Sequence, residues 1–284
     1  MQTARLLISC ADRPGIVAAV AGFLAERQAN IVALDQHSTG GSSGEFFARV
    51  EFDPQAGDLD EAAFARSFSP VAERFGMDWR IAYSGHRKRV AVLVSRYDHC
   101  LVDLLWRWRR GELLGDVTLV VSNHPDLAEE ATRAGVDFEY VPVAAADAKP
   151  AAEARMLSLL AGRVELVVLA RYMQILSAEF LARVGCPVIN IHHSFLPSFA
   201  GADPYQRAAD RGVKLIGATA HYVTEQLDEG PIIEQDVERV DHSRGPEDFT
   251  AVGRDVESVV LARAVRWHVE HRVLINGRKT VVFT

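Results

Sequence analysis

Residues 1–83 place their apolar positions in short runs, some at strand spacing and some at helix spacing. The runs predict strands over 4–10, 30–37, 45–53 and 77–83, and helices over 15–28 and 59–75. In the first helix, Ile16, Val20, Phe23 and Leu24 recur at helical intervals and share one face. The predicted order, βαββαβ, is that of a ferredoxin-like α+β domain.

A polar segment, Ser84-Gly85-His86-Arg87-Lys88, follows and is typical of a linker. We therefore predict two domains, residues 1–84 and residues 85–284. Beyond the linker, apolar strands are expected at 89–95, 117–122, 138–143, 165–170 and 187–191, with helices between them at 98–110, 125–134, 150–161 and 177–184. Strands without a polar face must be covered on both sides, so this domain is predicted to be α/β with a mostly parallel sheet.

The last part of the chain departs from this alternation. It contains two extended runs at 214–223 and 231–240, a long helix over about 246–271, and two short strands at 272–275 and 279–283. Asn276-Gly277 lies between those strands, which indicates a hairpin.

Composition narrows the classes of function. Among 284 residues, 38 are acidic and 31 basic, and this balance does not favour a nucleic-acid partner, whose phosphates attract basic surfaces. The three cysteines form no C-x-x-C pair, which favours a reducing compartment, and we expect a cytoplasmic protein. We expect no membrane association, because the sequence shows neither a signal-peptide pattern nor an apolar run of about 20 residues.

Polar side chains gather where the predicted strand 187–191 ends. Asn190 and His192 are two positions apart, so they share a face of an extended backbone. An amide can donate to a developing oxyanion and an imidazole can move a proton, so the pair suits catalysis at a carbonyl. A polar strand end with hydrogen-bonded side chains is an equally good explanation. Ligands of open parallel sheets bind beyond the carboxyl ends of the strands, which is where this pair is expected.

Two further groups follow. His221 lies in an extended run, and Asp228 lies in an acidic loop, where its carboxylate could orient an imidazole or a water molecule. A structural histidine and a solvated turn are the alternatives. We expect no metal, since no H-x-x-x-H or H-E-x-x-H pair is present and His192 and His193 are predicted to face opposite ways in a strand.

Motifs for other chemistries are absent from the sequence. It contains no G-x-S-x-G nucleophile elbow and no G-x-x-x-x-G-K-[ST] phosphate loop. The loop after the first strand of the larger domain, Ser95 to Cys100, has no glycine, so it cannot wrap closely around a phosphate.

Longer stretches around these residues resemble the folate-dependent formyltransferases. Residues 188–197, which include Asn190 and both histidines, resemble the family signature, and residues 170–176 and 217–233 resemble the segments that border its folate. The double histidine and the stretch Ser95 to Leu105 are similar to the formyltetrahydrofolate deformylase branch. The resemblance covers nearly the whole chain, and Asp12-Arg13-Pro14-Gly15-Ile16-Val17 is similar to the first loop of an ACT domain.

The resemblance implies a fold, a site and an activity. The implied fold is an ACT domain followed by a Rossmann-like formyltransferase domain. The implied activity is hydrolysis of 10-formyltetrahydrofolate to formate and tetrahydrofolate, with formate supplying purine biosynthesis and with no cofactor besides the substrate. The implied residues are Asn190, His192, Asp228 and His221 for catalysis; Arg171, Met173, Gln174, Leu176, Thr219, Gln226, Leu227 and Glu229 for folate; and Asp12, Arg13, Gly15 and Ile16 for a regulatory ligand.

The sequence departs from the family at Gln174, where relatives often carry arginine. Because pterin contacts in the family are largely made by the backbone, we expect folate recognition to survive this change. In relatives that transfer the formyl group to a ribonucleotide, a glycine-rich loop after the first strand holds the phosphate of that second substrate. The corresponding loop here, Ser95 to Cys100, has no glycine. The resemblance therefore implies that water takes the place of the second substrate.

Two alternatives remain open: formyl transfer to an unidentified amine, and a catalytically inactive regulator that binds folate or an amino acid. The ACT resemblance implies an amino-acid effector, such as glycine or methionine, or else a role in oligomerisation alone. We expect a homo-oligomer, either a dimer or a tetramer.

Overall fold

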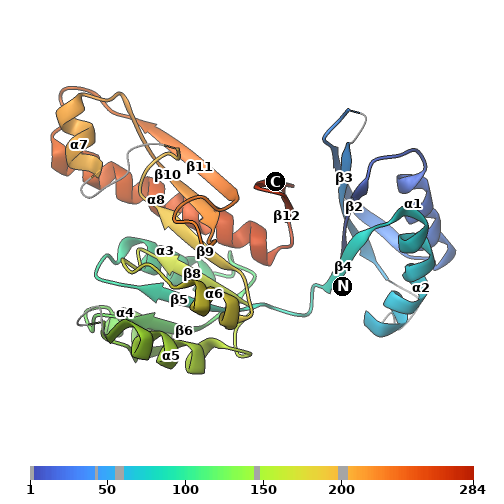
Figure 1. Ribbon diagram of the computed structural model, residues 1–284, viewed down its shortest axis with the longest axis horizontal. Helices are drawn as coiled ribbons and strands as arrows, with labels where there is room; N and C mark the ends of the chain where they lie inside the picture. Colours follow the sequence, from blue (N-terminus) through green and yellow to red (C-terminus); the bar gives the residue numbers. More distant parts are fainter. Residues whose placement is uncertain (1–2, 42–43, 55–60, 144–147, 198–203) are drawn as a thin grey trace. The chain divides into compact units, whose positions relative to one another are not determined.

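The computed structural model describes residues 3–41, 44–54, 61–143, 148–197 and 204–284, drawn as coloured ribbon in Figure 1. These residues form two compact units. The smaller unit comprises residues up to 87 together with 271–276 and 280–284, and the larger one comprises 88–270 and 277–279. Each unit has a sheet and a core of its own.

The smaller unit has the predicted βαββαβ order. Its elements are β1 (Ala4–Ala11), α1 (Ile16–Glu26), β2 (Asn30–Ser38), β3 (Glu45–Asp53), α2 (Glu61–Phe75) and β4 (Asp78–Tyr83). The sheet is antiparallel with strand order β2-β3-β1-β4. Alternate residues such as Leu6 and Ile8 face α1 and α2, where Phe64 and Phe68 stack with their ring centroids 5.5 Å apart. The first two residues of the predicted helix 59–75 lie outside the described residues.

The opposite face of this sheet is covered by the C-terminal hairpin, β12 (Val273–Asn276) and β13 (Lys279–Val282). Strand alternation turns Leu7 and Phe47 to that face, and they form a separate apolar cluster with Leu274 and Phe283. The predicted domain limits, 1–84 and 85–284, therefore differ from the compact units of the structure, because most of the C-terminal hairpin belongs to the smaller unit.

The larger unit contains the predicted mostly parallel sheet. Its elements are β5 (Arg89–Val94), α3 (His99–Arg109), β6 (Asp116–Ser122), α4 (Ala128–Ala134), β7 (Asp137–Tyr140), α5 (Lys149–Leu160), β8 (Leu166–Ala170), α6 (Ala178–Val184), β9 (Val188–His192), α7 (Pro204–Arg211), β10 (Leu215–Tyr222), β11 (Ile232–Arg239) and α8 (Pro246–Val269). The strand order is β11-β10-β9-β8-β5-β6-β7. β10 is antiparallel to both neighbours, so the two extended runs form an antiparallel edge.

Helices cover the larger sheet. α5 and α6 pack on the central strands, where Met156, Leu160 and Phe180 meet Leu93 and Val167. α3 and α8 contact each other, and α8 also packs on β9 and β10 (Figure 1). This coverage explains why β8 is buried at every position.

Helix α7 is absent from the elements predicted from the sequence. Its partly buried side consists of Tyr205, Ala208 and Ala209, which pack near Phe249 of α8. Two alanines and one tyrosine among polar residues give a weak helical periodicity, so the sequence pattern does not predict this helix. Its packing against α8 stabilises it instead.

No helix among the described residues combines the length and the apolar stretch that a bilayer crossing requires.

Candidate active site

A cavity of about 280 Å³ lies beyond the carboxyl ends of β8 and β9, the edge where the sequence places its candidate residues. Its walls are the segment 171–176, the end of β9, and the loop after β10. Asn190, His192, His221 and Asp228, the four residues predicted to be catalytic, all line it.

The pairing of β9 with β10 brings three of these side chains together. His221 stands directly opposite Asn190 in the antiparallel register. Nδ1 of His221 donates to the carbonyl oxygen of Tyr222 at 3.0 Å, so Nε2 faces Asn190, whose Nδ2 lies 3.3 Å away. His192 follows Asn190 by two positions on the same strand face, as predicted.

Asp228 reaches the histidines from the loop after β10. Its backbone is left-handed, with φ of 56°, a conformation that aspartate tolerates better than most residues. Gly230 allows the loop to return to the sheet, because a Cβ atom there would overlap the carbonyl oxygen of Tyr222. The backbone N–H of Tyr222 donates to Pro231 at 2.9 Å, which fixes the return. A strained backbone at such a position is typical of a functional site.

The Asp228 carboxylate contacts both imidazoles. Oδ2 lies 3.2 Å from Nδ1 of His192, and Oδ1 lies 3.5 Å from Nε2 of His221. Hydrogen bonds from His192 and from His221 hold the pKa of Asp228 well below its ordinary value, against the opposing effect of burial. The carboxylate is therefore ionised at neutral pH and keeps Nδ1 of His192 protonated, leaving Nε2 of His192 for a substrate.

The prediction that His192 and His193 face opposite ways is wrong. β9 ends at His192, so strand alternation does not extend to His193. The two rings stack with centroids 5.1 Å apart, and both line the cavity. Burial, helped by the charges of Arg171 and His192, lowers the pKa of His193 to about 4. His193 therefore stays neutral at pH 7.

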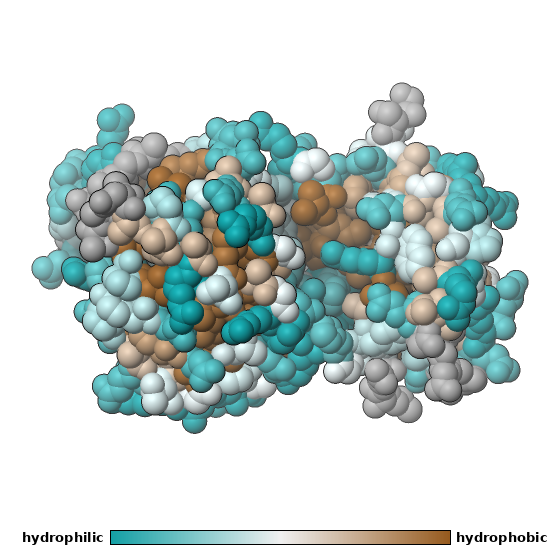
Figure 2. Space-filling model, turned by 60° about the horizontal axis from the view of Figure 1, so that its bottom comes forward, coloured by the Kyte–Doolittle hydropathy of each residue, from teal (hydrophilic) through white to brown (hydrophobic). Residues whose placement is uncertain are grey.

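The rim of the cavity is apolar. Met173, Ile175 and Leu227 line it and are 51%, 61% and 62% exposed, which is unusual for side chains this large. An apolar rim above a few convergent polar groups is suited to a flat aromatic ligand. On the face drawn in Figure 2, the left-hand, larger unit gathers apolar residues (brown) inside a mostly polar outline (teal).

Ser95, at the end of β5, fixes the segment 171–176. Its hydroxyl accepts from the backbone N–H of Met173 at 3.0 Å and donates to Asn123 at 2.7 Å. This contact gives the stretch from Ser95 to Leu105 a structural role in the site.

Three residues predicted to bind folate do not line the cavity. Thr219 is fully buried, and its hydroxyl donates to the carbonyl oxygen of Ser194 and accepts from the backbone N–H of Leu196. It thus fixes the chain after β9. Gln226 and Glu229 border a separate hollow, where Glu229 pairs with Arg278 at 2.8 Å. Arg171, Met173, Gln174, Leu176 and Leu227 do line the cavity.

The residues predicted to bind a regulatory ligand lie between β1 and α1. Gly15 is the N-cap residue of α1 with φ of 95°, and Ile16 is buried in the core. The Arg13 guanidinium lies 4.7 Å from the ring centre of Phe75, and Asp12 donates its backbone N–H to Gly44 at 2.8 Å. Their ligand remains a prediction.

A polar cluster that the sequence did not indicate lies behind His193. Glu257 of α8 is 1% exposed, accepts from Nε2 of His99 at 2.8 Å and accepts from the hydroxyl of Tyr205. His99 lies in a recognised stretch, but Glu257 lies on a helix whose pattern predicts only packing, and Tyr205 lies on α7, which the sequence pattern does not predict.

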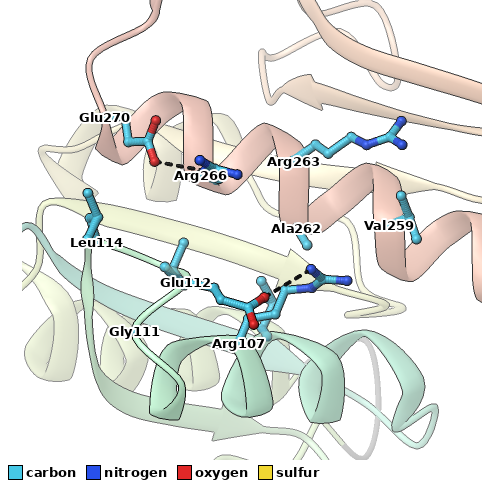
Figure 3. A pocket seen from close by; sticks show the side chains of 11 residues that line it. Arg107, Gly111, Glu112, Leu114, Val259, Ala262, Arg263, Arg266 and Glu270 are labelled. Atoms are coloured by element: carbon cyan, nitrogen blue, oxygen red, sulfur yellow. Dashed lines mark hydrogen bonds and ion pairs between the residues drawn. The ribbon is translucent and has the colours of Figure 1, made fainter. Parts of the chain in front are cut away.

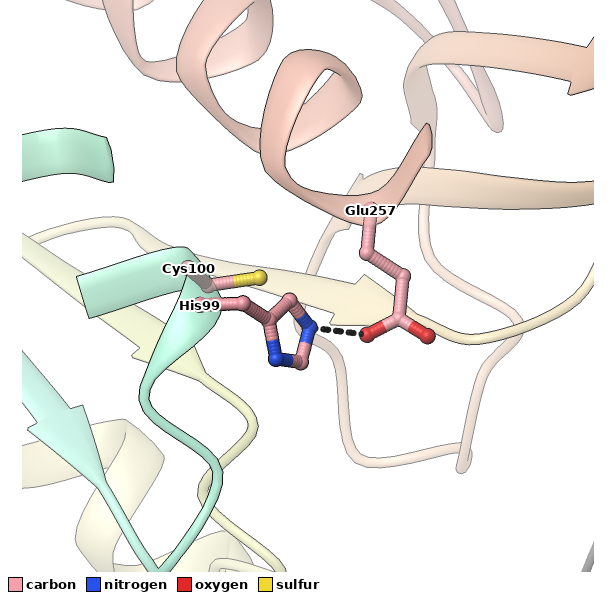
Figure 4. Close-up of side chains that lie close together, drawn as sticks. All are labelled: His99, Cys100 and Glu257. Atoms are coloured by element: carbon pink, nitrogen blue, oxygen red, sulfur yellow. Dashed lines mark hydrogen bonds and ion pairs between the residues drawn. The ribbon is translucent and has the colours of Figure 1, made fainter. Parts of the chain in front are cut away.

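Cys100 lies beside His99 and Glu257 in this cluster, so the three could in principle hold a metal ion (Figure 4). Burial raises the pKa of the Cys100 thiol well above its ordinary value, so the thiol stays protonated. Arg171 lies 3.5 Å from Glu257 and already neutralises its charge. Both effects disfavour a cation.

A larger hollow of about 600 Å³ lies between α3 and α8 (Figure 3). Its arginines are paired with carboxylates: Arg107 with Glu112, Arg266 with Glu270, and Arg263 with Asp236. The smaller cavity, where ionisable groups converge without full pairing, is therefore the better candidate site.

Comparisons with known proteins identify the families to which the two parts of the chain are related. Residues 4–65 match the ACT domain family model and residues 88–265 match the formyl transferase model. A formyltetrahydrofolate deformylase of Mycobacterium bovis is 58% identical, covering 98% of this chain and 90% of its own length.

Solved structures give the same result. A formyltetrahydrofolate deformylase from Pseudomonas syringae has a TM-score of 0.95 at 50% identity, covering 100% of this chain and 95% of its own. A glycinamide ribonucleotide transformylase from Symbiobacterium toebii has a TM-score of 0.66 at 34% identity, covering 71% of this chain and 97% of its own. The chain belongs to the formyltetrahydrofolate deformylase family.

Proposed function

We propose that this chain hydrolyses 10-formyltetrahydrofolate to formate and tetrahydrofolate. The observation that carries the proposal is the convergence of Asn190, His192 and Asp228 on one cavity with an apolar rim. An amide donor, an imidazole and a carboxylate are the groups that hydrolysis of a formamide requires. The identity to proteins named deformylases over nearly the full chain supports the same reaction.

Asn190 would stabilise the transition state. When water attacks the formyl carbon, the formyl oxygen acquires negative charge, and Nδ2 of Asn190 can donate a hydrogen bond to it. One donor of this kind contributes about 3–4 kcal/mol to catalysis. His221 supports this role, since its Nε2 lies 3.3 Å from the same amide nitrogen and fixes its orientation.

His192 would move the proton. The low pKa of Asp228 makes that carboxylate a weak base, so the water proton passes more readily to Nε2 of His192. Asp228 then stabilises the imidazolium through its contact with Nδ1 at 3.2 Å. As the C–N bond breaks, the proton returns to the folate nitrogen, and tetrahydrofolate and formate are released. The reaction needs no cofactor besides its substrate.

The folate ring would lie along the rim formed by Met173, Ile175 and Leu227. The backbone of the segment 171–176 is positioned by Ser95, so Gln174 in place of arginine leaves the ring contacts in place. Met173 and Ile175 supply apolar area to a planar ligand.

The test is an incubation of the full chain with 10-formyltetrahydrofolate and no amine. We expect formate and tetrahydrofolate to appear in equal amounts over many turnovers. Turnover that begins only when an amine is added would instead indicate a formyltransferase, the activity named for the relative from Symbiobacterium toebii. An inactive regulator would bind folate without any turnover.

We further propose that the ACT domain binds an amino acid, glycine or methionine, at residues 12–16. The chain would work in the cytoplasm as a dimer or tetramer. The formate that it releases would supply purine synthesis. Coupling between two ligand sites is typically worth 1–3 kcal/mol. Steady-state rates measured with each amino acid test whether it regulates the enzyme. An unchanged kcat and KM would refute the proposed effector. Light scattering at assay concentration tests the oligomer.

A further inference from the structure

The residue after β8, Arg171, has a conformation that most arginines avoid. Its φ is 60°, in the left-handed region that favours glycine. The residue lines the cavity, but its guanidinium points into the protein: Nε lies 3.5 Å from Glu257, and Cζ lies 4.9 Å from the ring centre of Tyr97. Arg171 is 9% exposed, and Nη1 has no hydrogen-bond partner among the described residues.

Arg171 belongs to the buried cluster around Glu257. Two charged groups and two polar rings fill this space, although burying charge is costly unless each group is well paired. Tyr205 of α7 packs against α8 at Gly253, where a Cβ atom would overlap its ring, and its hydroxyl donates to Glu257, one turn further along α8. The cluster therefore joins α3, α7, α8 and the end of β8.

The cluster occupies one particular side of the cavity. Arg171 and His193 both line the cavity, and the ring of His193 lies 6.4 Å from that of Tyr205, a member of the cluster. Burial, helped by the charge of Arg171, lowers the pKa of His193. With the folate ring on the apolar rim, as proposed above, this side is the part of the cavity that is left to a second substrate. The cavity, about 280 Å³, is at the lower end of the range for one small ligand.

We infer that Arg171, held against Glu257, fills the acceptor side of the cavity and restricts the nucleophile to water. Arg171 is thus a specificity-determining residue. The inference rests on the proposed hydrolysis and names the feature that separates this chain from an amine-using transferase.

The experiment uses Arg171→Gly, because glycine adopts the same φ without strain and leaves the guanidinium space open. The probe is hydroxylamine, a small amine nucleophile. Its nitrogen bonds to the formyl carbon while the folate C–N bond breaks, its lost proton goes to the folate nitrogen, and the product is N-hydroxyformamide. Formate and the hydroxamate are measured in the same reaction, after subtraction of the enzyme-free reaction.

The wild-type chain should give formate alone without hydroxylamine, and formate with only a trace of hydroxamate when hydroxylamine is present. Arg171→Gly should raise the ratio of hydroxamate to formate by roughly ten-fold or more, the order expected when one pocket group is removed. Arg171→Met is the matched control: it fills the same space without charge, so its ratio should stay near that of the wild type.

An unchanged ratio in folded Arg171→Gly would overturn the inference, as would an equal rise in Arg171→Met. Loss of all formate release in a folded Arg171→Gly protein would also overturn it, since Arg171 would then belong to the catalytic machinery. If Arg171→Gly does not fold, Arg171→Asn removes the guanidinium, tolerates the same left-handed backbone and decides by the same ratio. Absence of formate from the wild type would instead refute the proposed function.

Discussion

Asp228 serves two histidines with one carboxylate. Its oxygens lie 3.2 Å from His192 and 3.5 Å from His221, and these contacts keep it ionised. Asparagine has nearly the same shape and tolerates the same left-handed backbone, with φ of 56°. Asp228→Asn therefore removes charge while changing geometry little.

We expect Asp228→Asn to lower kcat by at least about a hundred-fold, because the imidazolium of His192 loses its stabilising charge, while KM changes by only a few-fold. Steady-state formate release gives both constants. A kcat close to that of the wild type would show that Asp228 has no part in proton transfer.

His193 makes the stability of the folded protein depend on pH. Its pKa is about 4 in the folded protein and about 6.5 in an unfolded chain, so between these values the unfolded chain binds a proton that the folded one does not. Stability is therefore lost as the pH falls below about 6.5. At pH 5, the shifted pKa of His193 lowers the free energy of unfolding by about 2 kcal/mol.

His193→Gln should remove this loss. Between pH 7 and pH 5 we expect the melting temperature of the variant to fall less than that of the wild type, as followed by circular dichroism. Equal falls in the two proteins would mean that His193 is not buried in a neutral state.

The site was predictable from the sequence as far as local patterns reach. Asn190, His192, His221 and Asp228 lie in recognisable stretches, and all four line the cavity. Thr219 lies in such a stretch too, but the register of β10 buries its hydroxyl, which a local pattern cannot reveal. Glu257 could not be found because it meets His99 across 158 positions.

At the scale of elements, the strands and most helices follow from hydrophobic spacing because each buries a regular face. α7 does not follow, since its place depends on Tyr205 fitting over Gly253 of α8. β10 and β11 were expected as extended runs, but their antiparallel pairing depends on the loop that carries Asp228.

Gly230 tests that loop. A side chain there would overlap the carbonyl oxygen of Tyr222, so Gly230→Ala should displace the loop and Asp228 with it. We expect kcat/KM to fall by roughly a hundred-fold, since small misplacements near the reacting centre have large effects. Gly22→Ala is the control, because its Cβ would meet open space in α1. Equal activity in both variants would show that the loop adapts without cost.

At the scale of the whole molecule, the two units have separate cores. The C-terminal hairpin covers the second face of the smaller sheet through Leu274 and Phe283. The predicted limits 1–84 and 85–284 missed this, because they divide the chain at a single point. The chain therefore closes its first unit with its last residues, and the larger unit is an insertion between them.

Leu274→Ala should lower the stability of the smaller unit by roughly 2–5 kcal/mol, as is usual for a buried leucine. Calorimetry should show one transition moving down while the rate of formate release at 25 °C stays the same. Leu215→Ala, at a leucine that is 50% exposed, should change little. A lower rate at unchanged stability would indicate that the hairpin acts on catalysis instead.

The account depends on water attacking a formyl carbon between Asn190, His192 and Asp228. The most direct measurement is the reaction of the full chain with 10-formyltetrahydrofolate in H₂¹⁸O, with the formate examined by mass spectrometry. We expect one ¹⁸O atom in each formate, an equal amount of tetrahydrofolate, and a rate from Asp228→Asn that is lower by at least about a hundred-fold. Formate without the label, or labelled formate at the full rate from Asp228→Asn, would contradict the account.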